Sequence, residues 1–205
     1  AALTAGVQGR APRGAVQLVG PSGIGKSRLL EEALAHAPPD LTVLRAACHP
    51  LEEVLLPALD GIIDPLSEHL AAWPSAQRAR LRSVDGALGV VFPSLAPFLG
   101  AAPADADPLA LRRRAAQALA ALFTLTQERA PVLLAVDDAQ WGDPGSWSLL
   151  REALEACEGR GPRLVLSTRH VVEDLAERCA VLRLGPLGEA DSRALFAAAH
   201  AHHLA

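Results

Sequence analysis

Short runs of continuously apolar residues alternate along the chain with longer stretches in which apolar residues recur every three or four positions. A continuous apolar run is typical of a strand buried on both faces, and the wider spacing is typical of a helix with one buried face. Strands that alternate with helices predict an α/β fold with a parallel sheet between two layers of helices. The predicted strands are 15–19, 41–46, 132–136, 163–167 and 181–184, and the predicted helices are 27–37, 108–129, 146–157, 171–178 and 189–203, with a helix end within 1–9 and a turn at 9–14.

The stretch 48–105 does not follow this alternation. Prolines interrupt it repeatedly, and helical patterns lie between them. Because proline ends or kinks a helix, the stretch predicts an insertion of short helices and loops packed on one side of the sheet. Just after it, Asp107 precedes Pro108 and is the predicted N-cap of the helix that follows.

The composition narrows the class of protein. A chain of 205 residues that is half hydrophobic and poor in aromatics predicts a single helix-rich α/β domain. A net charge of −4 argues against nucleic-acid binding, so the run 112–114 of three arginines is expected to be a solvated helix face rather than a phosphate contact. With no apolar stretch long enough to span a membrane and no signal peptide pattern, we expect a cytoplasmic domain.

Cysteines and histidines suggest no metal site. Cys48, Cys157 and Cys179 are far apart and odd in number, as expected for reduced thiols, and the histidines clustered at 200–203 lack zinc-ligand spacing. The chain has no methionine and ends within a predicted helix, so we expect residues 1–205 to be one domain of a longer protein.

A glycine-rich loop follows the first predicted strand and opens the next helix. It contains Lys26, the only lysine among 19 basic residues. The pattern Gly-x-x-x-x-Gly-Lys-Ser in this context is a Walker A loop, whose backbone N–H groups and lysine bind phosphates while Ser27 binds Mg²⁺. A glycine turn unrelated to phosphate is the weaker interpretation. The predicted nucleotide-binding residues are Gly20, Pro21, Ser22, Gly23, Ile24, Gly25, Lys26, Ser27 and Arg28.

Two carboxylates end the third predicted strand, in the run 132–138. The carboxyl end of a buried parallel strand is where such folds bind ligands. We therefore expect a Walker B motif, in which Asp137 holds Mg²⁺ and Asp138 orients or deprotonates the attacking water. Acidic residues also occur at such positions as helix caps.

The fourth predicted strand ends in Ser167, Thr168 and Arg169, on the same expected rim as Lys26 and Asp138. Arg169 is a candidate sensor of the γ-phosphate, and a surface ion pair is the alternative. The chain lacks the Asn-Lys-x-Asp motif that reads guanine, the Ser-Gly-Gly-Gln signature of transport ATPases and an arginine-rich kinase lid. These absences favour an ATPase over a GTPase, a transporter subunit or a small-molecule kinase.

The segment Asp137-Asp138-Ala139-Gln140-Trp141-Gly142-Asp143 resembles the Asp-Asp-x-(His/Gln)-Trp-(Ala/Gly)-Asp segment of AAA-like P-loop ATPase domains in STAND regulators. Large LuxR-type and maltose-activator-type transcriptional regulators contain such domains, as do modules attached to cyclases and kinases. The runs 23–30 and 184–187 are similar to the same family. The resemblance implies a three-layer fold of the ASCE/AAA-like type with strand order 5-1-4-3-2.

The resemblance also implies roles for single residues. Arg169 matches the family's sensor position, and Gln140 matches a polar position that helps place water or Mg²⁺. Trp141 is expected to pack structurally in the loop after Walker B rather than to stack on a ligand. A Gly-Arg-Glu motif before residue 1 and helical and winged-helix elements after residue 205 would complete the adenine pocket.

The resulting hypothesis is a regulatory ATPase switch in a multidomain protein. ATP with Mg²⁺ would hold an active, oligomeric state, and hydrolysis to ADP would close it, with output domains elsewhere in the same chain. The alternative is a nucleotide-sensing scaffold that does not hydrolyse ATP. A phosphotransferase with its own small substrate is a third, weaker alternative.

Overall fold

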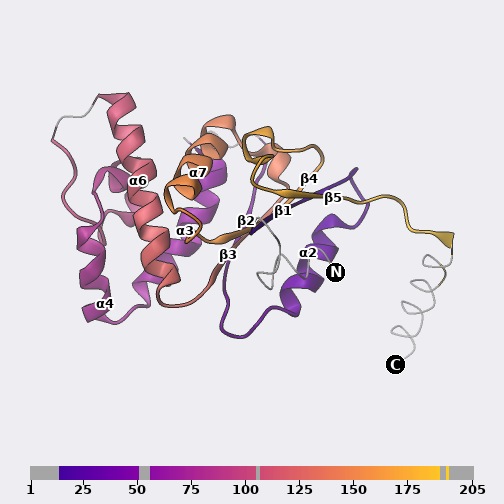
Figure 1. Ribbon diagram of the computed structural model, residues 1–205, viewed down its shortest axis with the longest axis horizontal. Helices are drawn as coiled ribbons and strands as arrows, with labels where there is room; N and C mark the ends of the chain where they lie inside the picture. Colours follow the sequence, from indigo (N-terminus) through magenta and orange to yellow (C-terminus); the bar gives the residue numbers. More distant parts are fainter. Residues whose placement is uncertain (1–13, 51–55, 105–106, 190–192, 194–205) are drawn as a thin grey trace.

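The computed structural model describes residues 14–50, 56–104, 107–189 and 193 of the chain. Its centre is a parallel sheet of five strands in the order β2-β3-β4-β1-β5 (Figure 1). This order is the predicted 5-1-4-3-2 counted from the other edge, and the α/β fold class is confirmed. The strands are β1 (Ala15–Val19), β2 (Thr42–Ala47), β3 (Val132–Asp137), β4 (Arg163–Thr168) and β5 (Ala180–Arg183).

Parallel pairing aligns the carboxyl ends of the strands at one edge of the sheet. The end of β1 is in register with the end of β4, through Val19 and Thr168, while β3 pairs along the other side of β4. The residues that follow β1, β3 and β4 therefore lie side by side, although they are far apart in the sequence. All three strands are buried almost throughout, which explains why their sequences are mostly apolar.

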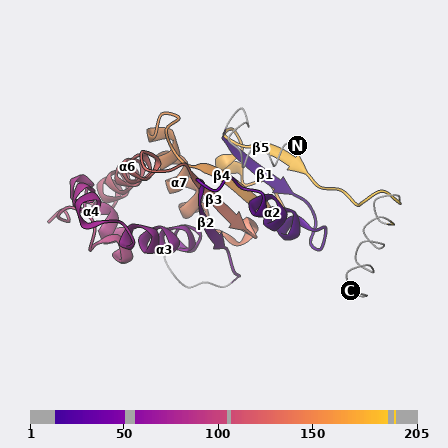
Figure 2. The same cartoon turned by 90° about the horizontal axis from the view of Figure 1, so that it is seen from below.

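Helices cover the two faces of the sheet unequally. Figure 2 shows α2 on one side of the strands and α3, α4 and α6 on the other. Leu30 and Leu34 of α2 pack on Leu18 and Val165 in the smaller of two hydrophobic clusters. The helices are α2 (Lys26–Ala35), α3 (Pro57–Ala71), α4 (Ser75–Arg80), α5 (Ala87–Val91), α6 (Pro108–Gln127) and α7 (Pro144–Ala156), with 3₁₀ turns η1 (Leu81–Ser83), η2 (Pro93–Leu95), η3 (Ala139–Trp141) and η4 (Glu173–Leu175).

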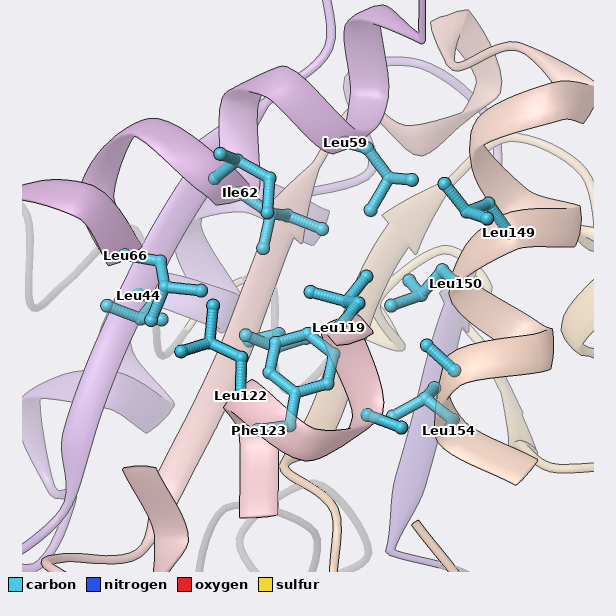
Figure 3. Packing of buried hydrophobic residues seen from close by; sticks show 14 of the residues in the cluster. Leu44, Leu59, Ile62, Leu66, Leu119, Leu122, Phe123, Leu149, Leu150 and Leu154 are labelled. Carbon is cyan, nitrogen blue, oxygen red and sulfur yellow. The ribbon is translucent and has the colours of Figure 1, made fainter. Parts of the chain in front are cut away.

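The larger cluster lies among α3, α6, α7 and the sheet. In Figure 3, Leu119 and Phe123 of α6 lie between Ile62 of α3 and Leu150 of α7. Each of these four side chains is completely buried. The insertion thus contributes a large part of the core, and the prediction that it packs on one side of the sheet is confirmed.

The internal structure of the insertion differs from the prediction at Pro65. Instead of ending a helix there, α3 continues through the proline to Ala71. An internal proline costs about 3 kcal/mol, whereas burying one leucine or isoleucine gains about 1.5–3 kcal/mol. Ile62 and Ile63 before the proline and Leu66 after it are all buried, so burial of the helix outweighs the lost hydrogen bond.

Polar contacts begin α6 and join it to its neighbours in the helical layer. Asp107 caps α6 as predicted, accepting hydrogen bonds from the backbone N–H groups of residues 109 and 110 at 3.2 and 3.0 Å. Arg112 pairs with Glu152 of α7 at 3.1 Å, and Arg114 pairs with Asp85 at 2.8 Å. The Arg114 guanidinium lowers the pKa of the Asp85 carboxyl below its ordinary value. The arginine run thus holds α6 against its neighbours rather than forming a purely solvated face.

The segment predicted as a helix over 171–178 contains only the 3₁₀ turn η4. Gln17 of β1 is fully buried and holds this segment, since its amide donates to the Val172 carbonyl at 3.1 Å and accepts from the Val172 N–H at 2.8 Å. Leu175 and Cys179 of the same segment are buried in the larger hydrophobic cluster, and burial raises the pKa of the Cys179 thiol to about 11. The sequence signal for this contact is a glutamine inside an otherwise apolar strand.

Replacing Gln17 with leucine is expected to lower the free energy of unfolding by roughly 2–4 kcal/mol, because both backbone groups of Val172 would lose their partners inside the protein. Urea denaturation followed by circular dichroism measures the change. Gln117→Leu on the exposed side of α6 is the matched control, with an expected change of about 0.5 kcal/mol or less. Equal stability losses in the two variants would contradict this role of Gln17.

Two predictions concern parts that the structure does not describe. The terminal segments 1–9 and 194–205, with the histidine cluster, lie outside the described residues, as does most of the predicted final helix. Among the residues that the structure does describe, no group of three or more potential metal ligands comes together. No helix in the described part of the chain is long and apolar enough to span a membrane.

Candidate functional site

The loop between β1 and α2 is held against the neighbouring strands at its first residue. The Gly20 N–H donates to the Thr168 carbonyl of β4 at 3.2 Å. A Cβ atom at Gly20 would lie 3.0 Å from the Leu184 carbonyl oxygen and 3.1 Å from a methyl carbon of Ile24. Close packing therefore favours glycine at this position.

Gly23 and Gly25 are required for a different reason. Their φ angles are +78° and +97°, a conformation that side-chain-bearing residues rarely adopt. Apart from the glycine itself and its two chain neighbours, no heavy atom of the described residues lies within 4 Å of a Cβ built on either glycine. Backbone conformation, and not crowding by the protein, thus explains both glycines. Gly25 in its left-handed conformation also begins α2.

The positive end of the α2 helix dipole has no side-chain partner among the described residues. No side chain in the described part of the chain caps this helix, and its first turn contains no acidic residue. Lys26 is buried, with 6% of its surface exposed, and its Nζ donates to the carbonyls of Gly20 and Pro21 at 3.0 Å each. A buried ammonium beside an uncapped helix N-terminus suits an anion, so the loop fits the phosphates of a nucleotide.

The other predicted loop residues lie around this centre. Pro21, Ser22 and Ser27 are exposed, and Ile24 is partly buried beside Gly20. Arg28 points along α2, pairing with the carboxylates of residues 31 and 32 at 3.7 and 3.5 Å. Its guanidinium is therefore engaged with the helix itself.

The two aspartates at the end of β3 differ in their surroundings. Asp137 accepts hydrogen bonds from the hydroxyl of Ser167 and, at 3.0 Å, from the Asp138 N–H. Ser167 is completely buried in β4 and is a site residue to which the sequence analysis assigned no role. These bonds occupy one oxygen of Asp137, Oδ1, and fix the direction of the carboxylate.

Asp138 lies outside the strand in a left-handed conformation, with φ of +52°. Its Oδ1 accepts a hydrogen bond from the Gln140 amide at 2.8 Å, and Gln140 Oε1 accepts one from the Arg169 N–H at 3.0 Å. Gln140 thus bridges the end of β3 to the end of β4. This bridge connects three of the residues that the sequence analysis singled out.

Two tryptophans follow the aspartates and differ in burial. Trp147 is buried, and a Cβ on Gly142 would lie 2.3 Å from its ring, so the two residues pack directly. Trp141 is 43% exposed, and the Arg169 guanidinium lies over its ring, 5.4 Å from the centroid. Trp147 is thus the buried indole of this segment, while the ring of Trp141 contacts a protein side chain at the surface; that Trp141 packs structurally rather than stacks on a ligand stays a prediction.

The last aspartate of the motif has a structural function. Asp143 accepts hydrogen bonds from the N–H and the hydroxyl of Ser146, and so caps α7. The Ser146 hydroxyl also accepts a hydrogen bond from the Leu59 N–H of α3 at 3.3 Å. Asp143 therefore fixes the start of two helices behind the site.

The structure places the predicted site residues at the carboxyl ends of three adjacent strands. The glycine loop follows β1, the two aspartates end β3, and Arg169 follows β4, which lies between them. The loop binds β4 through Gly20 and Thr168, and the aspartates bind β4 through Ser167 and Gln140. The geometry combines a site for phosphate anions with two carboxylates suited to Mg²⁺ and water.

Comparison with known proteins gives one sequence relative and several structures. An uncharacterized protein of Rhizobium meliloti (strain 1021) is 33% identical over 156 residues, which cover 70% of this chain and 15% of that protein. The chain thus spans only a small part of its relative's length.

Three solved structures are similar at low sequence identity. Drosophila ORC bound to AT-rich DNA and Cdc6 is 14% identical, with 91% of this chain and 52% of that chain covered and a TM-score of 0.45. The ATP-binding subunit of an ABC transporter is 20% identical, with 89% of this chain and 82% of that chain covered and a TM-score of 0.40. C. elegans PCH-2 is 13% identical, with 91% of this chain and 41% of that chain covered and a TM-score of 0.41.

The family model is the decisive comparison. The model of the AAA ATPase domain matches residues 1–166, well over half of the chain. The match includes β1 to β3, the glycine loop and both aspartates. Together with the site at the ends of β1, β3 and β4, it shows that the chain belongs to the AAA ATPase domain family.

Proposed function

We propose that the chain binds ATP with Mg²⁺ and hydrolyses it as the regulatory switch of a multidomain cytoplasmic protein of the STAND type. The observation that carries the proposal is the buried Lys26 beside the uncapped N-terminus of α2, at the same sheet edge as Asp137 and Asp138. The membership of the chain in the AAA ATPase domain family supports it.

The glycine loop and α2 supply the phosphate-binding half of the site. Backbone N–H groups at the start of α2 and the Lys26 ammonium would bind the triphosphate. This ammonium donates hydrogen bonds to two loop carbonyls, those of Gly20 and Pro21, which hold it at the loop. A phosphate would replace two neutral acceptors with a charged one, which strengthens the hydrogen bonds.

Ser27 and Asp137 would hold Mg²⁺. Both are oxygen donors, which Mg²⁺ prefers, and the bond from Ser167 fixes the Asp137 carboxylate. When bound, Mg²⁺ supplies positive charge that neutralises the phosphate oxygens. The hydroxyl of Ser27 is exposed at the start of α2, where a metal bound to the phosphates can reach it.

Asp138 would orient the attacking water and accept its proton. One carboxylate oxygen is engaged by the Gln140 amide, and this bond directs the other oxygen. Gln140 is therefore a positioning residue for the base, and it also holds the backbone of Arg169 beside it. Arg169 would contact the γ-phosphate and respond to its loss.

The switch hypothesis rests on the resemblance of the segment 137–143 to STAND regulators and on the two-state character that a γ-phosphate contact confers. Output domains in the same full-length protein would carry the signal, and the domain itself would bind neither nucleic acid nor membrane. ATP would favour a homo-oligomer, and ADP would favour the closed form. A sensor that binds ATP without hydrolysing it is the competing proposal.

An oligomerisation assay tests the switch. The full-length protein is expected to form a larger assembly with ATP and Mg²⁺ than with ADP and Mg²⁺, measured by light scattering after size-exclusion chromatography. A variant that binds but does not hydrolyse ATP should keep the larger assembly for longer. Indistinguishable masses with the two nucleotides would refute the switch and leave only an ATPase or a binding module.

A further inference from the structure

The contact between Arg169 and Trp141 joins the ends of two different strands. Arg169 follows β4, and Trp141 ends the 3₁₀ turn η3 that follows β3. The guanidinium lies over the indole ring, 5.4 Å from its centroid, which is within the range of a cation–π interaction. Both side chains are exposed at the edge of the sheet where the candidate site lies.

Packing does not account for Trp141. Trp141 has 43% of its surface exposed and belongs to neither of the two hydrophobic clusters among the described residues. Trp147, six residues later, supplies the buried indole of this segment and packs against Gly142. The contact that the structure shows for the Trp141 ring is the one with the Arg169 guanidinium.

The turn η3 holds Arg169 at two points. Gln140 accepts a hydrogen bond from the Arg169 backbone N–H, and Trp141, the next residue, contacts the Arg169 side chain. The same Gln140 donates to Asp138. One short turn thus fixes both the backbone and the guanidinium of Arg169 relative to the carboxylate at the end of β3.

We infer that Trp141 is a positioning residue, which holds the Arg169 guanidinium ready for the γ-phosphate of ATP. The inference rests on the proposed function, in which Arg169 contacts that phosphate. A free arginine side chain populates many rotamers and loses that freedom when it binds an anion. Contact with the ring restricts the side chain beforehand, so less freedom is lost on binding.

If Trp141 has this role, its ring affects the affinity for ATP but not the affinity for ADP. ADP has no γ-phosphate, so Arg169 has nothing to contact and the ring has no effect on ADP binding. Removal of the ring is expected to weaken ATP binding about two- to fivefold, the range of an exposed cation–π contact. Affinity for ADP is expected to stay the same.

Calorimetric titration of the purified chain with a non-hydrolysable ATP analogue, in place of ATP, and with ADP in the presence of Mg²⁺ tests the inference. Trp141→Leu should reduce the ATP preference, and Trp141→Phe should restore most of it, because phenylalanine keeps an aromatic face. Arg169→Ala should reduce the preference in its own right, and adding Trp141→Leu to Arg169→Ala should change nothing further. Leu109→Ala, at another exposed apolar residue, is the control and should leave both affinities unchanged.

Four results would overturn the inference. Equal losses of ATP and ADP affinity in Trp141→Leu would show that the ring only stabilises the loop. A gain of ATP affinity would show that the ring holds Arg169 away from the phosphate, and failure of Trp141→Phe to rescue would exclude a cation–π role. If the unchanged chain binds neither nucleotide, the proposed function itself fails, whereas normal ATP preference in Trp141→Leu overturns the role of Trp141 alone.

Discussion

Replacing Lys26 with alanine is expected to weaken ATP binding about 10- to 100-fold, because a hydrogen bond to a charged group contributes about 1.5–3 kcal/mol and tenfold in affinity corresponds to about 1.4 kcal/mol. Lys26 is the only lysine of the chain, and the structure places its ammonium at the loop, on the carbonyls of Gly20 and Pro21. Equilibrium titration with a fluorescent ATP analogue and Mg²⁺ measures the loss.

Two further variants define the cause of that loss. Lys26→Arg keeps the charge but adds a wide planar group, and it should also bind poorly, since the buried position leaves little room. Arg113→Ala removes an exposed cation from α6, far from the loop in sequence, and should bind ATP normally. ATP affinity in Lys26→Ala equal to that of the unchanged chain would contradict the phosphate-binding role of the loop.

Replacing Asp138 with asparagine is expected to slow hydrolysis about 100-fold or more, while ATP affinity changes little. The loss of charge removes the group that accepts the proton of the attacking water, an effect of about 10²–10⁴-fold in enzymes. Asparagine can still accept the hydrogen bond from Gln140, so the bridge to β4 is retained. Phosphate release at saturating ATP, measured over time, gives the rate.

Asp143→Asn is the matched control for this experiment. It makes the same chemical change in the same segment, but Asp143 caps α7, and asparagine is an equally good cap. Hydrolysis in Asp143→Asn should therefore stay close to that of the unchanged chain. Equal phosphate release in Asp138→Asn and the unchanged chain would reject Asp138 as the base and favour another catalytic group. No phosphate release from the unchanged chain would favour the non-hydrolysing sensor.

Features that depend on neighbours in the sequence were predicted well. The bounds of β1 agree with the apolar run 15–19, and Asp107 caps α6 as the sequence indicated. The glycine loop was recognised because a strand, a loop and a helix N-terminus follow one another directly. Such features form from local backbone conformation and apolar spacing, and both can be read from a short segment.

Features that depend on distant partners were missed or assigned wrongly. The helix predicted over 171–178 is replaced by a short turn because Gln17, more than 150 residues earlier, binds the backbone of Val172. The proline in α3 did not end the helix, because burial of its apolar face against α6 and α7 outweighs the local cost. Neither outcome is visible in the local sequence, since both energies come from tertiary contacts.

The motif 137–143 shows the same division in a single segment. The sequence by itself determined that a phosphate-binding loop and a pair of carboxylates are present, because each is a short run of residues with its own spacing. Only the tertiary structure decided that Trp147 is the buried indole, that Gln140 connects Asp138 to β4, and that the Trp141 ring contacts the Arg169 guanidinium. The reason is that parallel pairing of β1, β3 and β4 brings these residues together across large separations in the chain, and no local pattern encodes which side chains then meet.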